Sequence, residues 1–304
     1  MADGVFAYLQ PDGTWGWSNA GLVTGDDESL LVDTLFDLRL TGEMLDAMAP
    51  VLDARPITNL VNTHANGDHC YGNQLVAGPG VEIVSSVRAA AEMEDVTPAT
   101  LHAMVSADLG PELNGYVRRI FGPFEFDGIE VAPPTRTFEG TLELSVGDRP
   151  VELIEVGPAH TGGDVVAWAP GPRAVFAGDI LFIGGTPIVW AGPLANWVAA
   201  LERILALDPA VIVPGHGPLA DRADVELLAD YFRFVEREAG GRADAGIDPV
   251  DATREIDQLI DDSPFAGWTD RERICINVDA VYRHHRPGTP PTNVLDLFAR
   301  MAVY

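Results

Sequence analysis

The 304-residue sequence contains no lysine, so all 19 of its cationic side chains are arginines, against 46 aspartates and glutamates. The resulting formal net charge of -27 repels nucleic-acid phosphates and anionic membrane surfaces within a Debye length of roughly 8 Å at physiological salt. We therefore expect neither nucleic acid nor a membrane to be a partner. The missing lysines themselves are attributed to genomic base composition or salt adaptation.

Cysteine and long apolar runs are also scarce. Cys70 and Cys275 are the two thiols, and two cysteines outside any CxxC pair support neither a disulfide framework nor a thiolate metal site. No segment approaches the roughly 20 apolar residues of a membrane span, and no basic stretch followed by an apolar run opens the chain. The sequence therefore predicts a cytoplasmic protein.

Short β-type runs alternate with helical ones, which favours an α/β fold with residues 1–220 as the main domain. The hydrophobic fraction of 47% suffices for a large core. We expect an amphipathic helix in "LANWVAALERILALDP". The expected strands lie in "GVFAYLQ", "SLLVDT", "PITNLVNTH", "VEIVSS", "GIEVAPP", "TLELSVG", "RPVELIEVG", "DVVAWAP", "RAVFAGD" and "AVIVPGHG".

Two segments are expected to be helical additions to this pattern. Residues 87–126 have helical character broken by proline and glycine, so they predict an insertion. Residues 221–304 predict a helical C-terminal extension, with helices at 224–238 and 250–260, the linker "EAGGRADAGIDP" between them, and a third helix opened by a capping box of Thr269 and Glu272. These helices either wall an apolar substrate pocket or simply pack on the shell, and the tail could pair two subunits as a homodimer.

Unusual polar residues follow the predicted strands, at the point where each strand ends. Asp33 closes "LLVD", the cluster 64–69 follows "NLVNT", and His160, Asp179 and His216 each follow a further apolar run. Because side chains at strand ends converge along one edge of an α/β sheet, we expect these residues to meet. Imidazole nitrogens and carboxylate oxygens are ligands of zinc and similar ions, and a carboxylate such as Asp179 is suited to bridge two of them.

In family order, "HANGDH", "GPAHTGGD", "FAGDILF" and "VPGHGP" resemble the signature of the metallo-β-lactamase-fold superfamily of metal-dependent hydrolases, HxHxDH followed by a histidine, a bridging aspartate and a last histidine. The resemblance runs from about Val5 to Gly217. It implies a four-layer αβ/βα sandwich of two mixed β-sheets flanked by helices.

The resemblance also implies the ligands. It assigns His64 and His160 to a first metal, Asp68, His69 and His216 to a second, and Asp179 to the bridging position. Asp33 would support a ligand imidazole by a hydrogen bond without binding metal. The implied cofactor is one or two Zn²⁺ ions, with Mn²⁺ or Fe²⁺ as alternatives.

Asn66 departs from the family pattern, because it stands where the second histidine of HxH is expected. Its neutral amide oxygen binds zinc more weakly than imidazole does, although it suits harder ions. We therefore expect the first site to be weaker, occupied by another metal or empty, and the second site to be complete. This asymmetry argues against the superfamily's one-iron persulfide dioxygenase branch.

These residues predict a hydrolase in which a metal-bound hydroxide attacks the carbonyl of a small organic ester, thioester or lactone, with Asp68 as the catalytic residue that orients the nucleophile and carries protons. The missing lysines disfavour β-lactams, whose carboxylate lysine usually binds. One alternative is a metal-assisted polyketide cyclase of antibiotic biosynthesis, because "YLQPDGTW" and "NTHxxGDHxxGN" are similar to actinomycete aromatic polyketide cyclase/thioesterases. The other alternative is a binding protein with impaired catalysis.

Four further sets of residues keep open interpretations. His102 predicts a surface or lid histidine, and His284 with His285 at a helix end predicts a structural role. Trp15 and Trp17 either line the site mouth or pack in the core. Arg118 and Arg119 either meet an anionic substrate group or form a solvated face.

Overall fold

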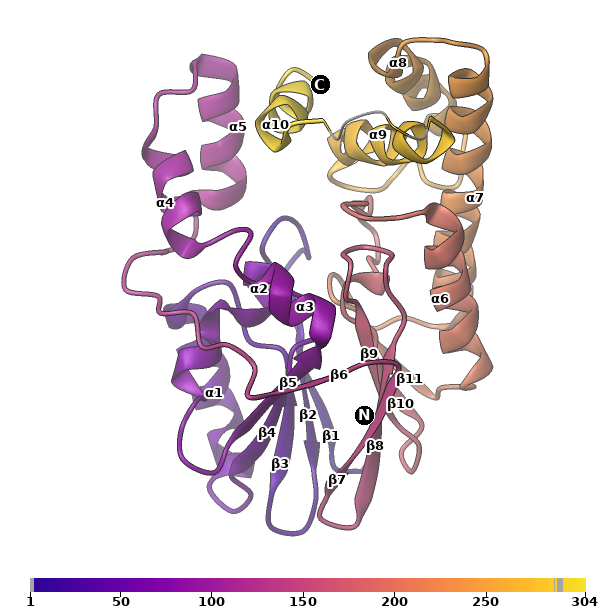
Figure 1. Ribbon diagram of the computed structural model, residues 1–304. Coiled ribbons are helices and arrows are strands. Elements are labelled where there is room, and N and C mark those ends of the chain that lie inside the picture. Colours follow the sequence, from indigo (N-terminus) through magenta and orange to yellow (C-terminus); the bar gives the residue numbers. More distant parts are fainter. Residues whose placement is uncertain (1–2, 287, 289–291) are drawn as a thin grey trace.

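Two mixed β-sheets form the centre of the computed structural model, which describes residues 3–286, 288 and 292–304 (Figure 1). The first sheet has the order β1 (Val5–Tyr8), β2 (Ala20–Thr24), β3 (Ser29–Val32), β4 (Ile57–Val61), β5 (Glu82–Ser86), β6 (Arg136–Phe138). The second has the order β11 (Val211–Val213), β10 (Ala174–Phe176), β9 (Val165–Ala169), β8 (Arg149–Glu155), β7 (Thr141–Val146). In the first sheet β3 to β6 run parallel, and in the second only β10 and β11 do.

Helices cover the outer faces of both sheets. Helix α1 (Leu38–Leu52) lies against the first sheet, and α6 (Leu194–Ala206) and α7 (Arg222–Asp244) lie against the second (Figure 1). Each presents an apolar face inward, such as Met44 and Met48 on α1. The predicted four-layer arrangement of two mixed sheets flanked by helices is therefore confirmed.

The two sheets pack on each other through alternating side chains. Val23, Leu30 and Val61 from the first sheet meet Leu153, Val165 and Phe176 from the second in one buried cluster. Gly21 on β2 is required there, because a Cβ at this position would lie 2.0 Å from the ring of Phe176.

The remaining helices lie toward the upper end of the sheets in Figure 1. They are α2 (Gly67–Cys70), η1 (Tyr71–Leu75), α3 (Val87–Glu92), α4 (Pro98–Ser106), α5 (Pro111–Phe121), η2 (Gly178–Ile180), α8 (Pro249–Ile260), η3 (Arg271–Arg273), α9 (Ile274–His285) and α10 (Val294–Ala302). The predicted helical insertion at 87–126 corresponds to α3, α4 and α5. Within the described residues, no helix is both long and apolar enough to cross a membrane.

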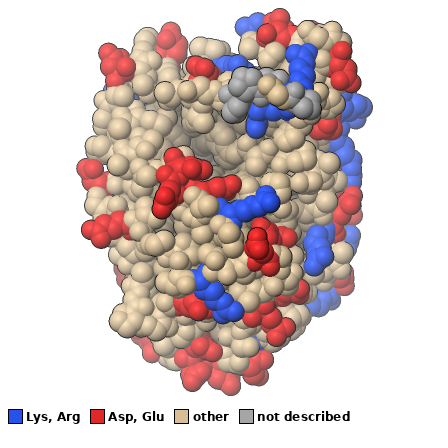
Figure 2. Space-filling view, viewed as in Figure 1, with Lys and Arg blue, Asp and Glu red and all other residues tan. Residues whose placement is uncertain are grey.

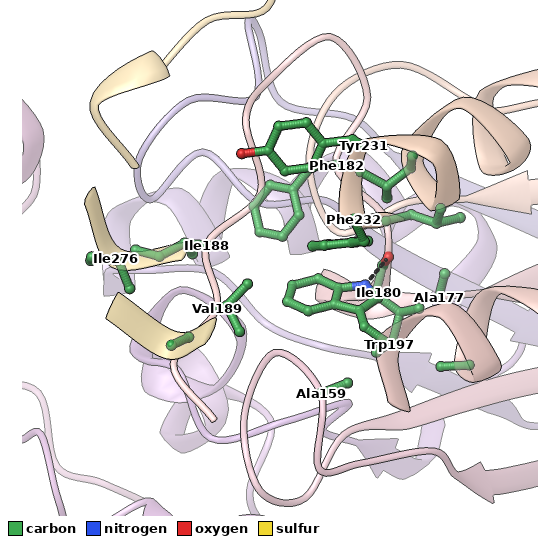
Figure 3. Close-up of a cluster of buried hydrophobic side chains, with 14 of the residues drawn as sticks. Ala159, Ala177, Ile180, Phe182, Ile188, Val189, Trp197, Tyr231, Phe232 and Ile276 are labelled. Carbon is green, nitrogen blue, oxygen red and sulfur yellow. Dashed lines mark hydrogen bonds between the residues drawn. The ribbon is translucent and has the colours of Figure 1, made fainter. Parts of the chain in front are cut away.

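The C-terminal helices share the core of the sandwich. The Trp197 ring of α6 lies 4.4 Å from the ring of Phe232 on α7, and its Nε1 donates a hydrogen bond to the Ile180 carbonyl at 2.9 Å (Figure 3). Ile276 of α9 packs in the same buried cluster. The helical extension is thus fastened directly behind the segment that carries Asp179.

Three local predictions were wrong. The segment "GIEVAPP" at 128–134 is not a strand, because its two prolines lack N–H groups and strand pairing begins only at β6. The predicted linker "EAGGRADAGIDP" is helical as far as Asp244, since α7 continues through Gly240. Thr269 and Glu272 form no capping box: Asp270 precedes η3 without a side-chain cap.

Candidate metal centre

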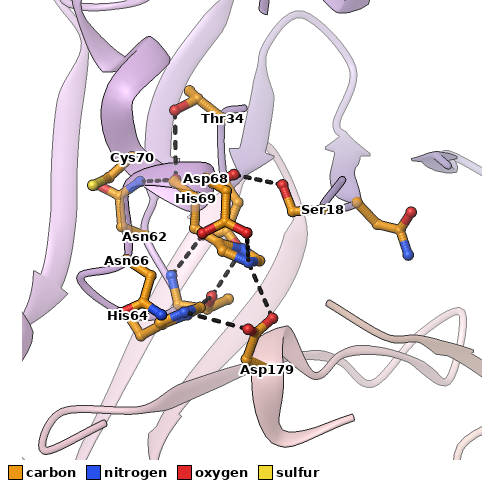
Figure 4. Close-up of polar contacts among 12 residues, drawn as sticks. Ser18, Thr34, Asn62, His64, Asn66, Asp68, His69, Cys70 and Asp179 are labelled. Carbon is orange, nitrogen blue, oxygen red and sulfur yellow. Dashed lines mark hydrogen bonds and ion pairs between the residues drawn. The ribbon is translucent and has the colours of Figure 1, made fainter. Parts of the chain in front are cut away.

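Six side chains from four separate segments converge where strands of the two sheets end, and Figure 4 labels His64, Asp68, His69 and Asp179 among them. His64 follows β4, and Asp68 and His69 lie on the short helix α2 directly after it. The other members follow strands of the second sheet: His160 after β8, Asp179 in η2 after β10, and His216 after β11. The fold therefore brings together the residues that the sequence predicts to meet at one edge. All six are buried, with exposed fractions between 0% and 8%.

Asp179 lies at the centre of this cluster. Its Oδ1 is 3.0 Å from Nε2 of His69, and its Oδ2 is 3.4 Å from Nε2 of both His160 and His216. His64 presents Nε2 to the same oxygen at 3.8 Å. One carboxylate thus faces four imidazoles, as a bridging ligand would.

The donor atoms fit a cation. Nε2 of His64 is buried and has no hydrogen-bond partner among the residues that the structure describes, while Nε2 of His69 and Oδ1 of Asp179 are buried 3.0 Å from each other without a well-formed hydrogen bond. Buried polar atoms without good hydrogen bonds are costly, so three such atoms close together favour the binding of a cation between them. One set of ligand atoms, from His64, His69 and Asp179, lies within 4.8 Å of one another, and so does a second set, from Asp68, His69 and His216. Both sets match the nitrogen and carboxylate chemistry of zinc-type sites.

Supporting hydrogen bonds orient the imidazoles. Asp33 accepts a hydrogen bond from Nδ1 of His69 at 2.9 Å, and it is itself fixed by the backbone N–H and the hydroxyl of Thr63, each at 2.7 Å. The predicted role of Asp33 behind a ligand is consistent with this contact. Nδ1 of His160 lies 2.7 Å from the Ile188 carbonyl, which directs Nε2 toward the cluster.

Asn66 occupies the position predicted to weaken the first site. Its amide nitrogen lies 3.0 Å from Nε2 of His160. Because Nδ1 of His160 donates to a carbonyl, Nε2 carries the lone pair and accepts from the Asn66 amide. This contact occupies the atom that His160 would offer to a metal. The second set, with Asp68, His69 and His216, carries no such obstruction.

The buried carboxylates and imidazoles of the cluster shift one another's pKa values. Burial opposes a charged imidazole, but the carboxylates of Asp179 and Asp68 outweigh it and raise the pKa of His69 well above its usual range. In the same way, Asp179 outweighs burial and raises the pKa of His216 to about 9. Burial and the nearby His69 lower the pKa of His64. At neutral pH, protons on His69 and His216 therefore occupy the places that a cation would take.

Two glycines allow the backbone to pass close to Asp179. A Cβ at Gly215 would lie 2.1 Å from Oδ1 of Asp179, and Gly178 has a φ of +51°, which most side chains disfavour. Both glycines stand in the quoted "FAGD" and "PGHG" segments.

Sequence reasoning missed Asp164, which shapes the loop that carries His160. Its buried carboxylate accepts hydrogen bonds from the backbone N–H groups of Ala159 and Thr161 and from the Thr161 hydroxyl, at 2.7 to 3.1 Å. The sequence did contain this residue within a quoted motif, since Asp164 is the aspartate that ends "GPAHTGGD".

The remaining predicted residues lie outside the cluster. His102 is half exposed and pairs with Asp127 at 3.1 Å, as predicted for a surface histidine. Arg119 pairs with Glu272 at 2.8 Å. Trp17 packs on Phe124 with ring centroids 5.1 Å apart, so it contributes to the core.

The sequence and fold were compared with known proteins. The chain is 26% identical over 305 residues to the 2,4-dinitroanisole O-demethylase subunit alpha of Nocardioides sp. (strain JS1661), a match covering 95% of this chain and 77% of the relative. A solved metallo-beta-lactamase from Pontibacter korlensis superposes with a TM-score of 0.58 at 20% identity, covering 77% of this chain and 96% of the other. A double mutant of the sec-alkyl sulfatase PisA1 superposes with a TM-score of 0.68 at 17% identity, covering 95% of this chain and 51% of the other.

These matches differ in how much of the chain they cover. Matches that cover 95% of the chain include most of the C-terminal helices, whereas the match to the Pontibacter enzyme leaves about a quarter of the chain unmatched. The family model described as the metallo-beta-lactamase superfamily matches residues 13–216, which hold every residue of the candidate metal centre. Together with the two mixed sheets and the histidine–aspartate cluster, this match shows that the chain belongs to the metallo-beta-lactamase superfamily.

Proposed function

We propose that this protein is a metal-dependent hydrolase of a small apolar ester, thioester or lactone. The observation that carries the proposal is the convergence of buried imidazoles on Asp179 with unpartnered donor atoms among the described residues. A bound divalent cation would supply a Lewis acid and a water molecule of near-neutral pKa. Asp68, His69 and His216 with Asp179 would hold it, because their ligand atoms face one another and none of them is contacted by an amide such as that of Asn66.

Asp68 is the residue best placed to handle protons. Its exposed fraction of 8% is the largest of the six side chains, and its Oδ2 lies 3.3 Å from Nε2 of His216. A carboxylate at the open side of the cluster can orient a water molecule, take its proton and deliver that proton to the leaving group. Asp33 would keep the His69 ring in one orientation throughout, since its carboxylate holds the Nδ1 proton.

The inserted helices support an apolar substrate. Figure 2 shows a hollow between the side of α4 and α5 and the side of α9 and α10, above α3. Tyr116 and Phe121 on α5 are buried and contact Trp15, whereas Met104 and Val105 on α4 are half-buried. A small organic molecule entering here would meet aromatic and aliphatic surface before the metal centre.

A hydrolysis assay on p-nitrophenyl esters and acyl thioesters tests the proposal. We expect activity to disappear after chelation and to return with zinc, manganese or iron(II). Asp68→Asn should lower kcat by about a hundredfold or more, the usual contribution of a positioned general base. Asp127→Asn, an exposed carboxylate outside the cluster, is the matched control and should change little. Undiminished turnover in the chelated protein would exclude metal-dependent hydrolysis.

A second candidate is hydrolysis of an aryl alkyl ether. The observation that favours it is the match to the 2,4-dinitroanisole O-demethylase subunit, because that match includes the C-terminal helices beyond the family model. Incubation with 2,4-dinitroanisole should then release 2,4-dinitrophenol, a coloured product, faster than p-nitrophenyl acetate is cleaved. A rate on the ether no greater than in buffer would exclude this candidate and leave the acyl substrates.

Metal-assisted cyclisation of a polyketone at the same metal centre is the alternative that the motifs "YLQPDGTW" and "NTHxxGDHxxGN" suggest. Ring closure of a poly-β-ketone without release of an acyl group would distinguish it from hydrolysis. A third possibility, a binding protein with impaired catalysis, predicts ligand binding without turnover of any of these substrates.

A further inference from the structure

A second group of buried polar atoms without partners lies outside the metal centre. Nε of Arg273, Nε1 of Trp15 and Oδ2 of Asp270 all lack a hydrogen-bond partner in the part of the chain that the structure describes. Arg273 is only 2% exposed, although its charge favours water. Such a group carries a desolvation cost unless something binds it.

The three side chains contact one another. The Arg273 guanidinium carbon lies 4.5 Å from the centre of the Trp15 ring, and Nη2 lies 3.2 Å from Oδ2 of Asp270. Nη1 donates to the Thr186 carbonyl at 2.9 Å, which holds the guanidinium in place. We call Trp15, Asp270 and Arg273 the Arg273 cluster. It offers two N–H donors without partners, Nε of Arg273 and Nε1 of Trp15, and the second lone pair of Oδ2 of Asp270, whose close contact is the ion pair with Arg273.

This cluster lies one aromatic ring away from the metal centre. The Arg273 guanidinium is 5.6 Å from the centre of the Phe182 ring. That same ring stacks on His216, with centroids 5.0 Å apart and planes inclined by 2°. The Phe182 ring therefore contacts both the Arg273 cluster and the side of the metal centre that His216 forms.

Three aromatic rings from two further segments pack around Trp15. Its centroid lies 6.5 Å from Tyr116 and 6.1 Å from Phe121 on α5, and 5.9 Å from Phe298 on α10. Phe298 in turn lies 6.3 Å from Trp190, whose backbone N–H donates to the His160 carbonyl at 3.0 Å. Tyr116 also lines a groove of about 470 Å³ between α5 and α10. The groove lies next to the Arg273 cluster, because Tyr116 contacts both, and such aromatic surroundings suit a flat aromatic body.

The charges at the Arg273 cluster determine which polar group of a bound aromatic molecule would fit there. Asp270 already neutralises Arg273, and Glu272 pairs with Arg119 nearby, so the cluster has no spare positive charge for an anion. What remains free is a donor set on Arg273 and Trp15 and an acceptor on Asp270. A hydroxyl matches both, since it accepts one hydrogen bond and donates another.

We propose that the Arg273 cluster binds the hydroxyl of a neutral phenolic substrate, whose rings lie among the surrounding aromatic side chains. The inference rests on the proposed function, because it names the substrate class of the same site. The hydroxyl accepts from Nε of Arg273 or Nε1 of Trp15 and donates to Oδ2 of Asp270. Arg273, Trp15 and Asp270 are thus specificity-determining residues.

Equilibrium dialysis with a matched pair of probes tests this proposal without any turnover. 2-Naphthol both donates and accepts, whereas 2-methoxynaphthalene can only accept. We expect the protein as purified to bind 2-naphthol about tenfold more tightly, the effect of one or two net hydrogen bonds. Trp15→Phe and Asp270→Asn should reduce this preference to less than threefold, while Trp268→Phe, which removes an indole N–H elsewhere, should retain it. Asparagine tolerates the left-handed backbone of Asp270, φ +52°, so that variant keeps the loop.

The measurement is repeated after chelation to separate the cluster from the metal centre. An unchanged preference supports the proposal, even if every hydrolysis assay fails. A preference that disappears on chelation would place the hydroxyl on the metal and overturn the proposal. Equal affinity for both probes, or a full preference in the Trp15→Phe and Asp270→Asn variants, would overturn it as well.

Discussion

Replacing Asn66 by histidine should convert an unequal pair of metal sites into two sites of similar strength. In the present chain, the Asn66 amide donates to Nε2 of His160 at 3.0 Å. Breaking that hydrogen bond costs about 1 kcal/mol, which lowers metal affinity at the first site about fivefold. The substitution removes this cost and adds an imidazole beside His64 and His160.

The matched variant Asn66→Ala separates the two effects. It removes the competing hydrogen bond without adding a ligand, so affinity at the first site should rise by about fivefold at most. Asn66→His should exceed this gain and raise the zinc content measured after dialysis toward two ions per chain. Elemental analysis and competition with a chromophoric chelator give the numbers. A zinc content of Asn66→His equal to that of the natural chain would refute the reasoning, because Asn66 or another residue would then already serve as the ligand.

Three more perturbations act on the same centre. Asp33→Asn places an amide N–H against Nδ1–H of His69, so chelator competition should show a 10- to 100-fold lower zinc affinity, the usual cost of losing a supporting carboxylate. Gly215→Ala directs a Cβ to within 2.1 Å of Oδ1 of Asp179, so the carboxylate must move and zinc titrations should show weaker binding. The pKa of His216 is raised to about 9 and that of His69 lies well above its usual range, so two protons compete with metal at neutral pH; zinc affinity should therefore fall about a hundredfold per pH unit as pH drops from 8 to 6, a factor of ten for each proton, measured in the same competition assay.

Each of these three predictions would be contradicted by a specific result. Unchanged affinity in Asp33→Asn would mean that His69 does not bind the ion through Nε2. An unchanged zinc affinity in Gly215→Ala would show that Asp179 does not bind the metal. A pH-independent affinity between 6 and 8 would show that no proton leaves His216 when the ion binds.

The metal centre could be predicted from sequence because each of its residues directly follows an apolar strand. His64, His160, Asp179 and His216 are far apart in the chain, but strand ends share one edge of the fold. The position of Asn66 could likewise be interpreted from the local pattern alone, and the structure adds the contact with His160.

Two of the three wrong predictions concern residues whose partners are distant in the sequence. Gly240 predicts a break in a helix, yet it lies where α7 meets α9, and a Cβ there would be 2.7 Å from the His285 ring. Glu272 is spaced as a helix cap, yet its carboxylate pairs with Arg119, 153 residues away. The Arg273 cluster was missed for the same reason, since nothing adjacent in the sequence links Arg273 to Trp15.

The central claim, that these side chains form a metal centre, is tested most directly by elemental analysis of protein purified without chelator and then incubated with stoichiometric zinc. The account predicts at least one tightly held transition-metal ion per chain, lost in Asp179→Ala and retained in the surface control Asp127→Ala. A natural chain without bound metal, or an Asp179→Ala variant that binds as much as the natural chain, would contradict it.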